Sequence, residues 1–466
     1  MGQTITKTTR WALISAGLLT FLGILNETSM NVAYEIISHQ FNISLDLVQW
    51  ITTGYLLTVT IIMGATAYLL RTFPARWLHL TAGLMFLTGA VLSALAPNFT
   101  WLLVGRILQG VSTGLATPIM FHLIFTQVPK QYLGATTGMA GMIISLAPAL
   151  GPLFGGSISH QLTWRWIFWL IMPLIIVALI GGQLFIRNQL KANVNLYFNF
   201  GALIALGGAL TSFILSANQL GATKSHYHFY LWGLGGILML IIFIAINLFS
   251  KSPLINFKIF RFPTIRTAAV TYFGLQFMNI GLSVVLPTYA VYVMRTNSFV
   301  AGLILLPGSL VGAFTSPFAG ILADRYGAKW PVSIGAAIFL IATWAMMAFQ
   351  RPLLTPWGLA LSFACFRFGF NLAFSNTISY AAATADHALT PDVNSCFNML
   401  QQFAGAVSVT LATALISYQQ HFAKLGHLPY RTYLGSRHAF IMMFLIAIVV
   451  VSMIYLTYHV NRPNKK

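Results

Sequence analysis

The segment WALISAGLLTFLGILNETSMNVA, residues 11–33, contains a single charged residue, Glu27, in a run of apolar and small residues. About 20 apolar residues are enough for a helix to cross the hydrocarbon core of a bilayer. The segment therefore predicts a membrane-spanning helix with an acid inside it. A carboxylate in hydrocarbon is costly, and membrane proteins rarely keep one that has no use. Because protonation is the least costly way to hold it there, Glu27 is a candidate proton carrier.

The composition of the whole chain agrees with this interpretation. Hydrophobic residues make up 58% of the 466 residues and charged residues only 7%, whereas a soluble globular domain carries about 25% charged residues. Long continuous apolar runs indicate helices and not a β-barrel, so the predicted fold class is an all-α polytopic membrane protein. Fourteen spans are expected, at residues 11–33, 47–70, 75–96, 100–125, 133–158, 164–187, 198–218, 228–250, 266–290, 299–322, 328–349, 355–382, 394–418 and 438–460.

The net charge of +19 follows the predicted topology. With the N-terminus in the cytoplasm, 16 of the 25 Lys and Arg residues fall on the cytoplasmic side and seven on the outer side, leaving Arg106 and Arg367 inside spans. This positive-inside distribution places both termini in the cytoplasm, and no nucleic-acid partner is expected. The chain has no GxxxxGK[ST] loop, so ATP is not expected as the energy source. No cofactor is expected, and no residues show metal-ligand spacing.

Two parts of the chain resemble copies of one unit. Spans 1–6 and spans 9–14 have matching loop patterns, and Arg106 in span 4 corresponds to Arg367 in span 12. Asn26 in span 1 corresponds more loosely to Asn279 in span 9. Transporters built from repeats place their substrate near the middle of the bilayer, between the halves. The predicted parts are a six-helix bundle at 1–190, two inserted helices at 191–262 and a second six-helix bundle at 263–466.

Four short motifs carry a resemblance to a known family. Residues 320–329, GILADRYGAK, resemble the G-x-L-a-D-R-x-G-r-[KR] loop of the major facilitator superfamily. Residues 151–156, GPLFGG, are similar to the antiporter motif of its drug exporters, and residues 105–110, GRILQG, are similar to its R-x-x-Q-G motif. Residues 25–33, LNETSMNVA, resemble the L-D-x-T-x-x-N-v-A signature of the fourteen-helix drug:proton antiporters.

The resemblance covers nearly the whole chain and implies two six-helix bundles plus two inserted helices. It implies a monomeric, proton-coupled antiporter in a bacterial cytoplasmic membrane, and not an enzyme. The antiporter would export lipophilic or amphiphilic drugs from the cytoplasm or inner leaflet by alternating access. Its partners would be a small lipophilic substrate, protons and membrane lipid. A lipid or glycolipid translocase on the same fold is the alternative function.

The chain departs from the family pattern at two places. The acid of span 1 is expected one position earlier, where this chain has Asn26, and one residue turns a helix by about 100°. The loop at residues 70–76 keeps basic residues but lacks the Gly and Asp of the family's loop. A cytoplasmic latch based on such an Asp is therefore expected only in the second half, at Asp324.

Glu27 and Arg106 are the predicted proton-coupling pair. Counted from the ends of their spans at 1.5 Å per residue, both lie about 9 Å below the outer boundary. Rocking of the halves would change the balance between attraction of the two charges and the cost of removing them from water. The alternatives are a static structural pair and a Glu27 that stays solvated near the interface. Asn31 and Gln109 share the helix faces of Glu27 and Arg106.

Polar and aromatic residues of several spans predict a substrate pocket. Phe273, Gln276 and Asn279 follow one another at steps of three, which places them on one broad helix face. A mixed pocket of this kind suits lipophilic cations or neutral amphiphiles, whereas the alternative is hydrogen bonding and packing between helices. The predicted substrate-binding residues are Asn26, Asn31, Tyr55, Gln109, Phe273, Gln276, Asn279, Arg367, Phe370 and Asn371.

Two motifs are assigned to conformational change. The resemblance implies that the small-residue motif forms a seam that closes the central cavity from outside, and the alternative is an ordinary helix contact. Its residues are Gly151, Pro152, Gly155 and Gly156. Asp324 and Arg325 are expected to latch the cytoplasmic side, and the alternative is a solvated loop charge worth about 0–1 kcal/mol.

Overall fold

Each long apolar run forms a helix because a bilayer interior offers no other partner for backbone N–H and C=O groups. The computed structural model describes residues 5–43, 45–48, 50–187, 198–222, 227–250, 253–296, 298–348, 355–385, 389–422 and 427–460. Within these ranges, fourteen helices are long and apolar enough to cross a membrane, and no strand is present. The predicted fold class is confirmed.

The spanning helices follow one another along the chain in three groups. The first half contains α1 (Lys7–Ser29), α4 (Trp50–Thr72), α5 (Ala75–Ala94), α6 (Phe99–Gln127), α7 (Leu133–Gln161) and α8 (Trp166–Phe185). The inserted pair is α9 (Phe200–Ala222) and α10 (Tyr227–Phe249). The second half contains α11 (Pro263–Tyr292), α13 (Leu305–Tyr326), α14 (Lys329–Ala348), α15 (Pro356–Thr384), α16 (Thr390–Phe422) and α17 (Leu428–Tyr455). Short helices lie between or after them: η1 (Met30–Ala33), α2 (Tyr34–Phe41), α3 (Leu45–Val48), η2 (Lys130–Tyr132), η3 (Phe257–Arg261), α12 (Ser298–Leu303) and η5 (Leu456–Val460).

The first span ends earlier than the expected residue 33. The Ser29 hydroxyl donates to Leu25 O at 2.6 Å, and the Thr28 hydroxyl donates to Ile24 O at 3.1 Å. The same kind of bond occurs inside uninterrupted helices, as at Thr60 and Thr66 of α4, so it does not by itself end α1. The helix ends at Ser29, and the chain continues through η1 into α2. Glu27 therefore lies in the last turn of α1.

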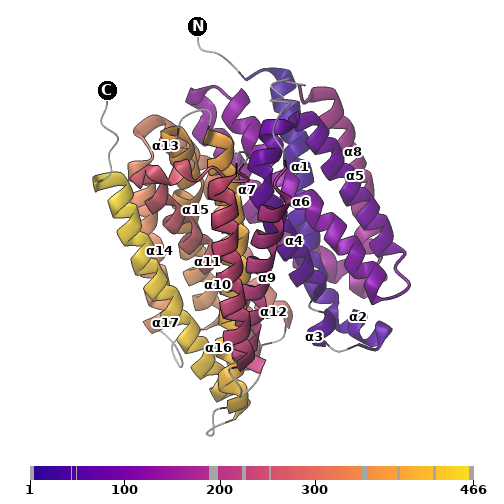
Figure 1. Cartoon of the computed structure of the whole chain (residues 1–466). Helices are drawn as coiled ribbons and strands as arrows, with labels where there is room; N and C mark the ends of the chain where they lie inside the picture. Colours follow the sequence, from indigo (N-terminus) through magenta and orange to yellow (C-terminus); the bar gives the residue numbers. More distant parts are fainter. Residues whose placement is uncertain are drawn as a thin grey trace.

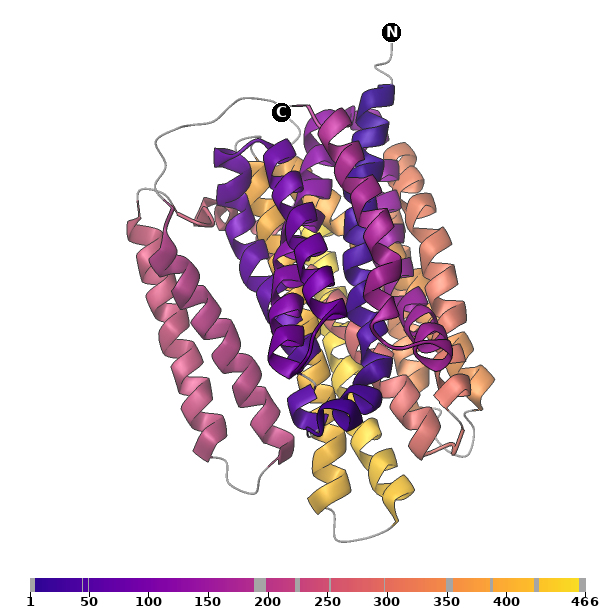
Figure 2. The same cartoon turned by 90° about the vertical axis from the view of Figure 1, so that its right-hand side faces the viewer.

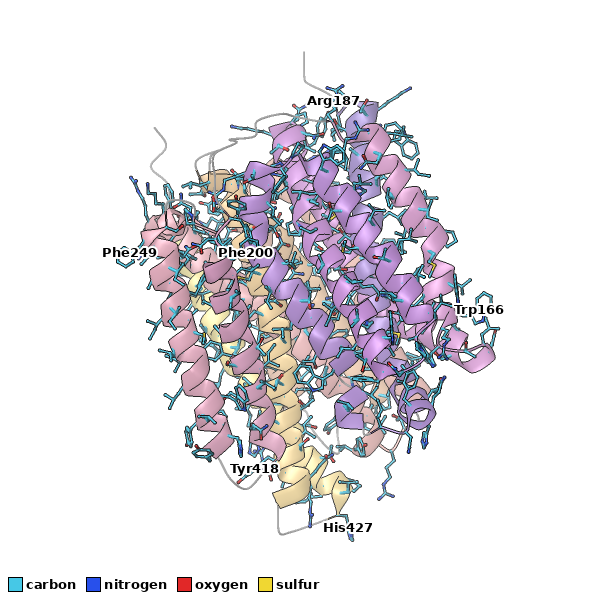
Figure 3. The ribbon with its side chains drawn as sticks, turned by 45° about the vertical axis from the view of Figure 1, so that its right-hand side comes forward. Trp166, Arg187, Phe200, Phe249, Tyr418 and His427 are labelled. Carbon is cyan, nitrogen blue, oxygen red and sulfur yellow. The ribbon has the colours of Figure 1, made fainter. Side chains whose placement is uncertain are left out.

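In each half, one helix packs against three others (Figure 1). In the first half α6 packs against α1, α4 and α5, and in the second half α15 packs against α11, α13 and α14. The halves meet along two seams, one between α7 and α13 and one between α4 and α16. Figure 1 places both ends of the chain at the same end of the bundle, as an even number of spans requires. In Figure 3, Arg187 lies near one end of the bundle, and His427 lies at the other.

The inserted helices α9 and α10 stand side by side at the margin of the bundle (Figure 2). Helix α9 packs against both α4 and α16, so it lies along one of the two seams between the halves. Leu206 of α9 fills the space above Gly64 of α4, where a Cβ would come within 2.6 Å of its side chain. Helix α10 presents Leu234, Leu238 and Ile241 as exposed surface, which is the composition of a lipid-facing helix.

Glycines of α7 allow a close approach of α1. A Cβ at Gly155 would meet the backbone of Ser29, and one at Gly151 would meet the Thr28 side chain, whereas one at Gly156 would meet nothing within 4 Å. Packing of α7 on α1 therefore needs Gly151 and Gly155 in this conformation. The side chain of Pro152 lies outside the described residues, and closure of a cavity by this seam stays a prediction.

Gly155→Ala is expected to lower the unfolding temperature of the detergent-purified protein, measured by fluorescence. One methyl group must push α1 away from α7, and overpacking of this kind costs about 1–3 kcal/mol. Gly156→Ala is the matched control on the same helix, since its methyl group enters open space. Equal unfolding temperatures for the two variants would contradict the packing described.

Candidate functional site

A fully buried arginine organises the first half. Arg106 of α6 has no exposed surface and donates through Nη1 to Gln109 Oε1 at 2.8 Å and through Nε to Ile51 O at 3.3 Å. Its guanidinium lies 4.3 Å from the centre of the Tyr55 ring. A buried cation needs such hydrogen bonds and π contacts because hydrocarbon supplies neither.

The Gln109 carbonyl oxygen links this arginine to α1. Asn26 Nδ2 donates to Gln109 Oε1 at 2.9 Å, so one oxygen accepts hydrogen bonds from Asn26 and Arg106. Asn26 and Gln109 are both fully buried. The amide that stands at the family's acid position therefore belongs to a closed network of side chains.

Tyr55 joins a third helix to the network. Its hydroxyl donates to Gly23 O at 2.9 Å and lies 2.6 Å from Thr113 Oγ1. A Cβ at Gly23 would overlap the Thr113 side chain, so α1 and α6 can approach only where residue 23 is glycine. The hydroxyl of Tyr55 thereby connects α1, α4 and α6. Thr113 was absent from the predicted site, because a single threonine in an apolar helix has no distinguishing signal.

Glu27 has a different environment from its neighbour in the sequence. Its side chain is partly exposed, and no hydrogen bond or ion pair within 4.0 Å joins it to another described residue. The positive charge of Arg106 still acts on its carboxylate, so Glu27 lies on the side of α1 that faces the network. No hydrogen bond or ion pair joins Glu27 to Arg106 between the described atoms, and the static structural pair stays an alternative. The side chain of Asn31 lies outside the described residues.

The second half repeats this plan with other residues. Arg367 of α15 is 4% exposed, and its Nη1 donates to Asn279 Oδ1 of α11. Asn279 Nδ2 donates to Gln276 Oε1 at 3.1 Å, and Arg367 lies 5.3 Å from the Phe370 ring centre. The predicted correspondence between Asn26 and Asn279 therefore has a structural counterpart, since each amide belongs to a network around the arginine of its half.

An aromatic column continues from Arg367 along α15. Phe363, Phe366, Phe370 and Phe374 stack in succession with centroid separations of 6.2, 6.1 and 4.9 Å. Tyr272 of α11 stacks on Phe374 at 4.5 Å. The spacing of three and four residues was a usable signal for this column, but only Phe370 was predicted as a site residue.

Most residues of the predicted substrate pocket are buried in this conformation. Phe273 and Asn279 are partly exposed. The others with described side chains are at most 4% exposed: Asn26, Tyr55, Gln109, Gln276, Arg367, Phe370 and Asn371. Contact of these residues with a substrate stays a prediction. No group of three or more metal-ligating side chains occurs in the part of the chain that the structure describes.

Asp324 joins the two halves at the predicted cytoplasmic end. Its carboxylate oxygens accept the backbone N–H groups of Gly134 and Ala135, each at 2.9 Å. These donors lie in the first turn of α7, where backbone N–H groups have no partner within the helix. A Cβ at Gly138 would lie 2.8 Å from Pro317 Cα of α13, so this seam is also closely packed. The adjacent Arg325 is exposed.

Comparison with known proteins agrees with this architecture. The sequence pattern of the Major Facilitator Superfamily matches residues 16–409. The lincomycin resistance protein LmrB of Bacillus subtilis is 30% identical over 94% of this chain and 93% of its own length. LmrB of Listeria monocytogenes is 32% identical over 86% of this chain and 85% of its own length. The multidrug resistance protein B homolog of Mycobacterium tuberculosis is 26% identical over 88% of this chain and 76% of its own length.

A solved structure shares the fold. The human organic anion transporter MFSD10 (TETRAN) matches with a TM-score of 0.65 over 94% of this chain and 99% of that chain. At 14% identity this likeness concerns the fold alone. The family predicted from the motifs is confirmed, and the bacterial relatives together with the fourteen apolar helices indicate a multi-pass bacterial membrane protein. The chain belongs to the major facilitator superfamily, whose members are transporters and not enzymes.

Proposed function

We propose that this protein exports lipophilic or amphiphilic drugs across the bacterial cytoplasmic membrane in exchange for protons, by alternating access. Glu27 carries the proposal. Of the acidic side chains that the structure describes, it is the one without a hydrogen bond or ion pair, since Asp324 and Asp392 both have bonded partners. Relatives named for lincomycin resistance and multidrug resistance support a drug as the substrate.

The position of Glu27 suits a group that binds and releases a proton. It lies in the last turn of α1, and the negative end of a helix dipole opposes a carboxylate there. The nearby charge of Arg106 has the opposite effect. Small movements of α1 relative to α6 change the balance between these influences. A proton from outside neutralises Glu27. A substrate from the cytoplasm competes with the proton for the same conformational state of the protein.

Phe273 and Asn279 are the predicted pocket residues that we propose to meet the substrate first. Both are partly exposed, and Asn279 is held by the Arg367 network. An aromatic ring beside an amide offers apolar contact together with one hydrogen-bonding group, which suits an amphiphile. The buried members of the pocket hold the surrounding helices in place.

Glu27→Gln is expected to abolish substrate-driven proton movement, because glutamine keeps the shape and polarity of the side chain but cannot release a proton. Purified protein in liposomes with an imposed proton gradient allows luminal pH to be followed while lipophilic cations and neutral drugs are added. Glu27→Asp is the matched control, since it keeps an ionisable group and is expected to retain part of the flux.

The outcomes separate the candidate functions. Flux that persists in Glu27→Gln at the wild-type rate would refute Glu27 as the proton site. Absence of flux with every compound, together with movement of labelled lipid between leaflets, would favour the lipid translocase. The measurement requires that the variants reach the membrane at wild-type levels.

The charge of the substrate should decide how transport responds to voltage. With one acid we expect one proton to enter per cycle. Export of a neutral drug then moves one net positive charge inward, export of a monocation moves no net charge, and export of a dication moves one net positive charge outward. An inside-negative potential of about 100 mV changes the driving force by about 2.3 kcal/mol per charge. It should accelerate export of a neutral drug, leave a monocation unaffected and slow a dication. A potassium diffusion potential across the liposome measures this, and equal responses would argue for another stoichiometry.

Asp324→Asn is expected to loosen the α7–α13 seam. The variant replaces a charged carboxylate, which accepts two hydrogen bonds from the first turn of α7, with a neutral amide. Such bonds contribute about 0.5–2 kcal/mol, equivalent to about a 2- to 30-fold change in the open fraction. The readout is alkylation of a cysteine introduced by Ser316→Cys, a buried position in this seam, in a chain lacking its native cysteines. Tyr326→Phe, at an exposed residue near the end of the same helix, is the control and should leave the rate unchanged. Identical rates in both variants would remove Asp324 from the latch.

A further inference from the structure

An ion pair joins the two halves at the second seam. Arg71 Nη1 at the end of α4 lies 3.2 Å from Asp392 Oδ2 in the first turn of α16. The Asp392 side chain has no exposed surface, and that of Arg71 is 24% exposed. Removal of one partner leaves an uncompensated charge on the other, whereas the intact pair favours the conformation in which α4 and α16 meet.

The sequence repeat relates this ion pair to the Asp324 contact. Residues 75–77, Ala-Arg-Trp, align with residues 328–330, Ala-Lys-Trp, and counting back five positions from the basic residue aligns Arg71 with Asp324. The same position therefore carries a cation in one half and a carboxylate in the other. Asp324 accepts backbone N–H groups from the start of α7. Arg71 cannot accept them, and instead Asp392 at the start of α16 supplies the carboxylate.

The chain that leaves the inserted helices binds both members of this pair. Asp392 Oδ1 accepts the backbone N–H of Asn256 at 2.7 Å, and Arg71 Nη2 donates to Pro253 O at 3.2 Å. Asn247 of α10 holds this segment in place, since its Oδ1 accepts Leu254 N–H at 2.9 Å. The segment 253–256 is thus connected at once to α10, to α4 and to α16.

The inserted helices follow the same seam through the membrane. Helix α9 packs along α4 and α16, and its Leu206 lies against Gly64 of α4 and close to Met399 of α16. Figure 2 shows the pair α9–α10 beside the bundle. Opening of the α4–α16 seam at this end separates Arg71 from Asp392, and it separates the segment 253–256 from at least one of them.

We propose that Arg71, Asp392 and the segment 253–256 form a second cytoplasmic latch of reversed polarity, through which the inserted helix pair controls opening of the α4–α16 seam. The proposal rests on the proposed function only in assuming alternating access. It assigns a role to the inserted helices, which act as a third body clamped across the two halves. The α7–α13 seam lacks such a clamp between its described residues and is held by Asp324.

A native cysteine reports on this latch. Cys396 of α16 is 3% exposed and lies one turn beyond Asp392, so an alkylating reagent reaches it only when the seam opens. Cys365 is exposed and is removed by Cys365→Ser, which leaves Cys396 as the single thiol. The readout is the alkylation rate in liposomes relative to the denatured protein. It needs neither substrate nor proton gradient, so failure of the latch and failure of drug export are observed separately.

The first comparison exchanges the charges. Arg71→Asp and Asp392→Arg are each expected to raise the alkylation rate about tenfold or more, since a tenfold change in an equilibrium requires only about 1.4 kcal/mol. The double variant Arg71→Asp with Asp392→Arg is expected to return part of the protection, because the ion pair can form in reverse while the bonds to the segment 253–256 stay lost. A double variant that reacts as fast as either single variant would overturn the ion pair as a latch.

The second comparison tests the segment from the inserted helices. Asn256 has φ of −79°, which proline tolerates, so Asn256→Pro removes the N–H donor to Asp392 with little change in backbone conformation. Asn256→Ala keeps that N–H and is the matched control. We expect alkylation to accelerate severalfold in Asn256→Pro and to remain within about twofold of the parent in Asn256→Ala. Equal rates in both variants would overturn the role of the segment, and this arm stands even if the charge variants fail to fold.

Discussion

Hydrocarbon cannot solvate a charge, and this constraint decides where each charged side chain of the bundle lies. Arg106 is fully buried because Gln109, the Ile51 carbonyl and the Tyr55 ring replace water around it. Since Gln109 Oε1 also accepts a hydrogen bond from Asn26, the group that satisfies the arginine also holds α1 against α6. The need to satisfy one cation therefore orders the helices of the first half.

Both halves surround a buried arginine with amide side chains, but the halves differ in their acids. Arg367 in the second half is held by Asn279, and Asn279 in turn donates to Gln276. Only the first half places an acid, Glu27, beside its arginine network among the described residues. A repeat that duplicates the arginine but not the acid suits a protein in which one half binds the proton. The second half instead carries the buried aromatic column on α15.

The seams between the halves combine close packing with a few polar contacts. Glycines let backbones of α7 and α13 touch, which gives many weak contacts that are lost together when the seam opens. Asp324 and Asp392 add contacts at the ends of the seams, where water can replace them after separation. Such contacts stabilise one conformation without making it permanent, because the charges are solvated again once the seam opens. A transporter that alternates between two conformations needs seams of this kind.

Hydropathy and the distribution of Lys and Arg among the loops are properties of the linear sequence. Sequence alone therefore determined the fourteen spans and the family motifs, and it predicts the topology. Local patterns also predicted Arg106, Arg367 and Asp324 as special positions, since charged residues stand out in apolar runs. The end of α1 was predicted less well, because the apolar run continues to Ala33 while the α-helix changes to the short helix η1 after Ser29.

Only the tertiary structure decided which side chains meet. Neighbours in sequence point in different directions on a helix, so Asn26 enters a closed network while Glu27 stays partly exposed. Arg71 and Asp392 lie 321 positions apart, and neither residue shows by its type or spacing that the other is its partner. The role of a membrane-embedded residue depends on the surface that another helix presents to it. That surface exists only after the helices have packed, because packing is what removes both water and lipid from the side chains between them.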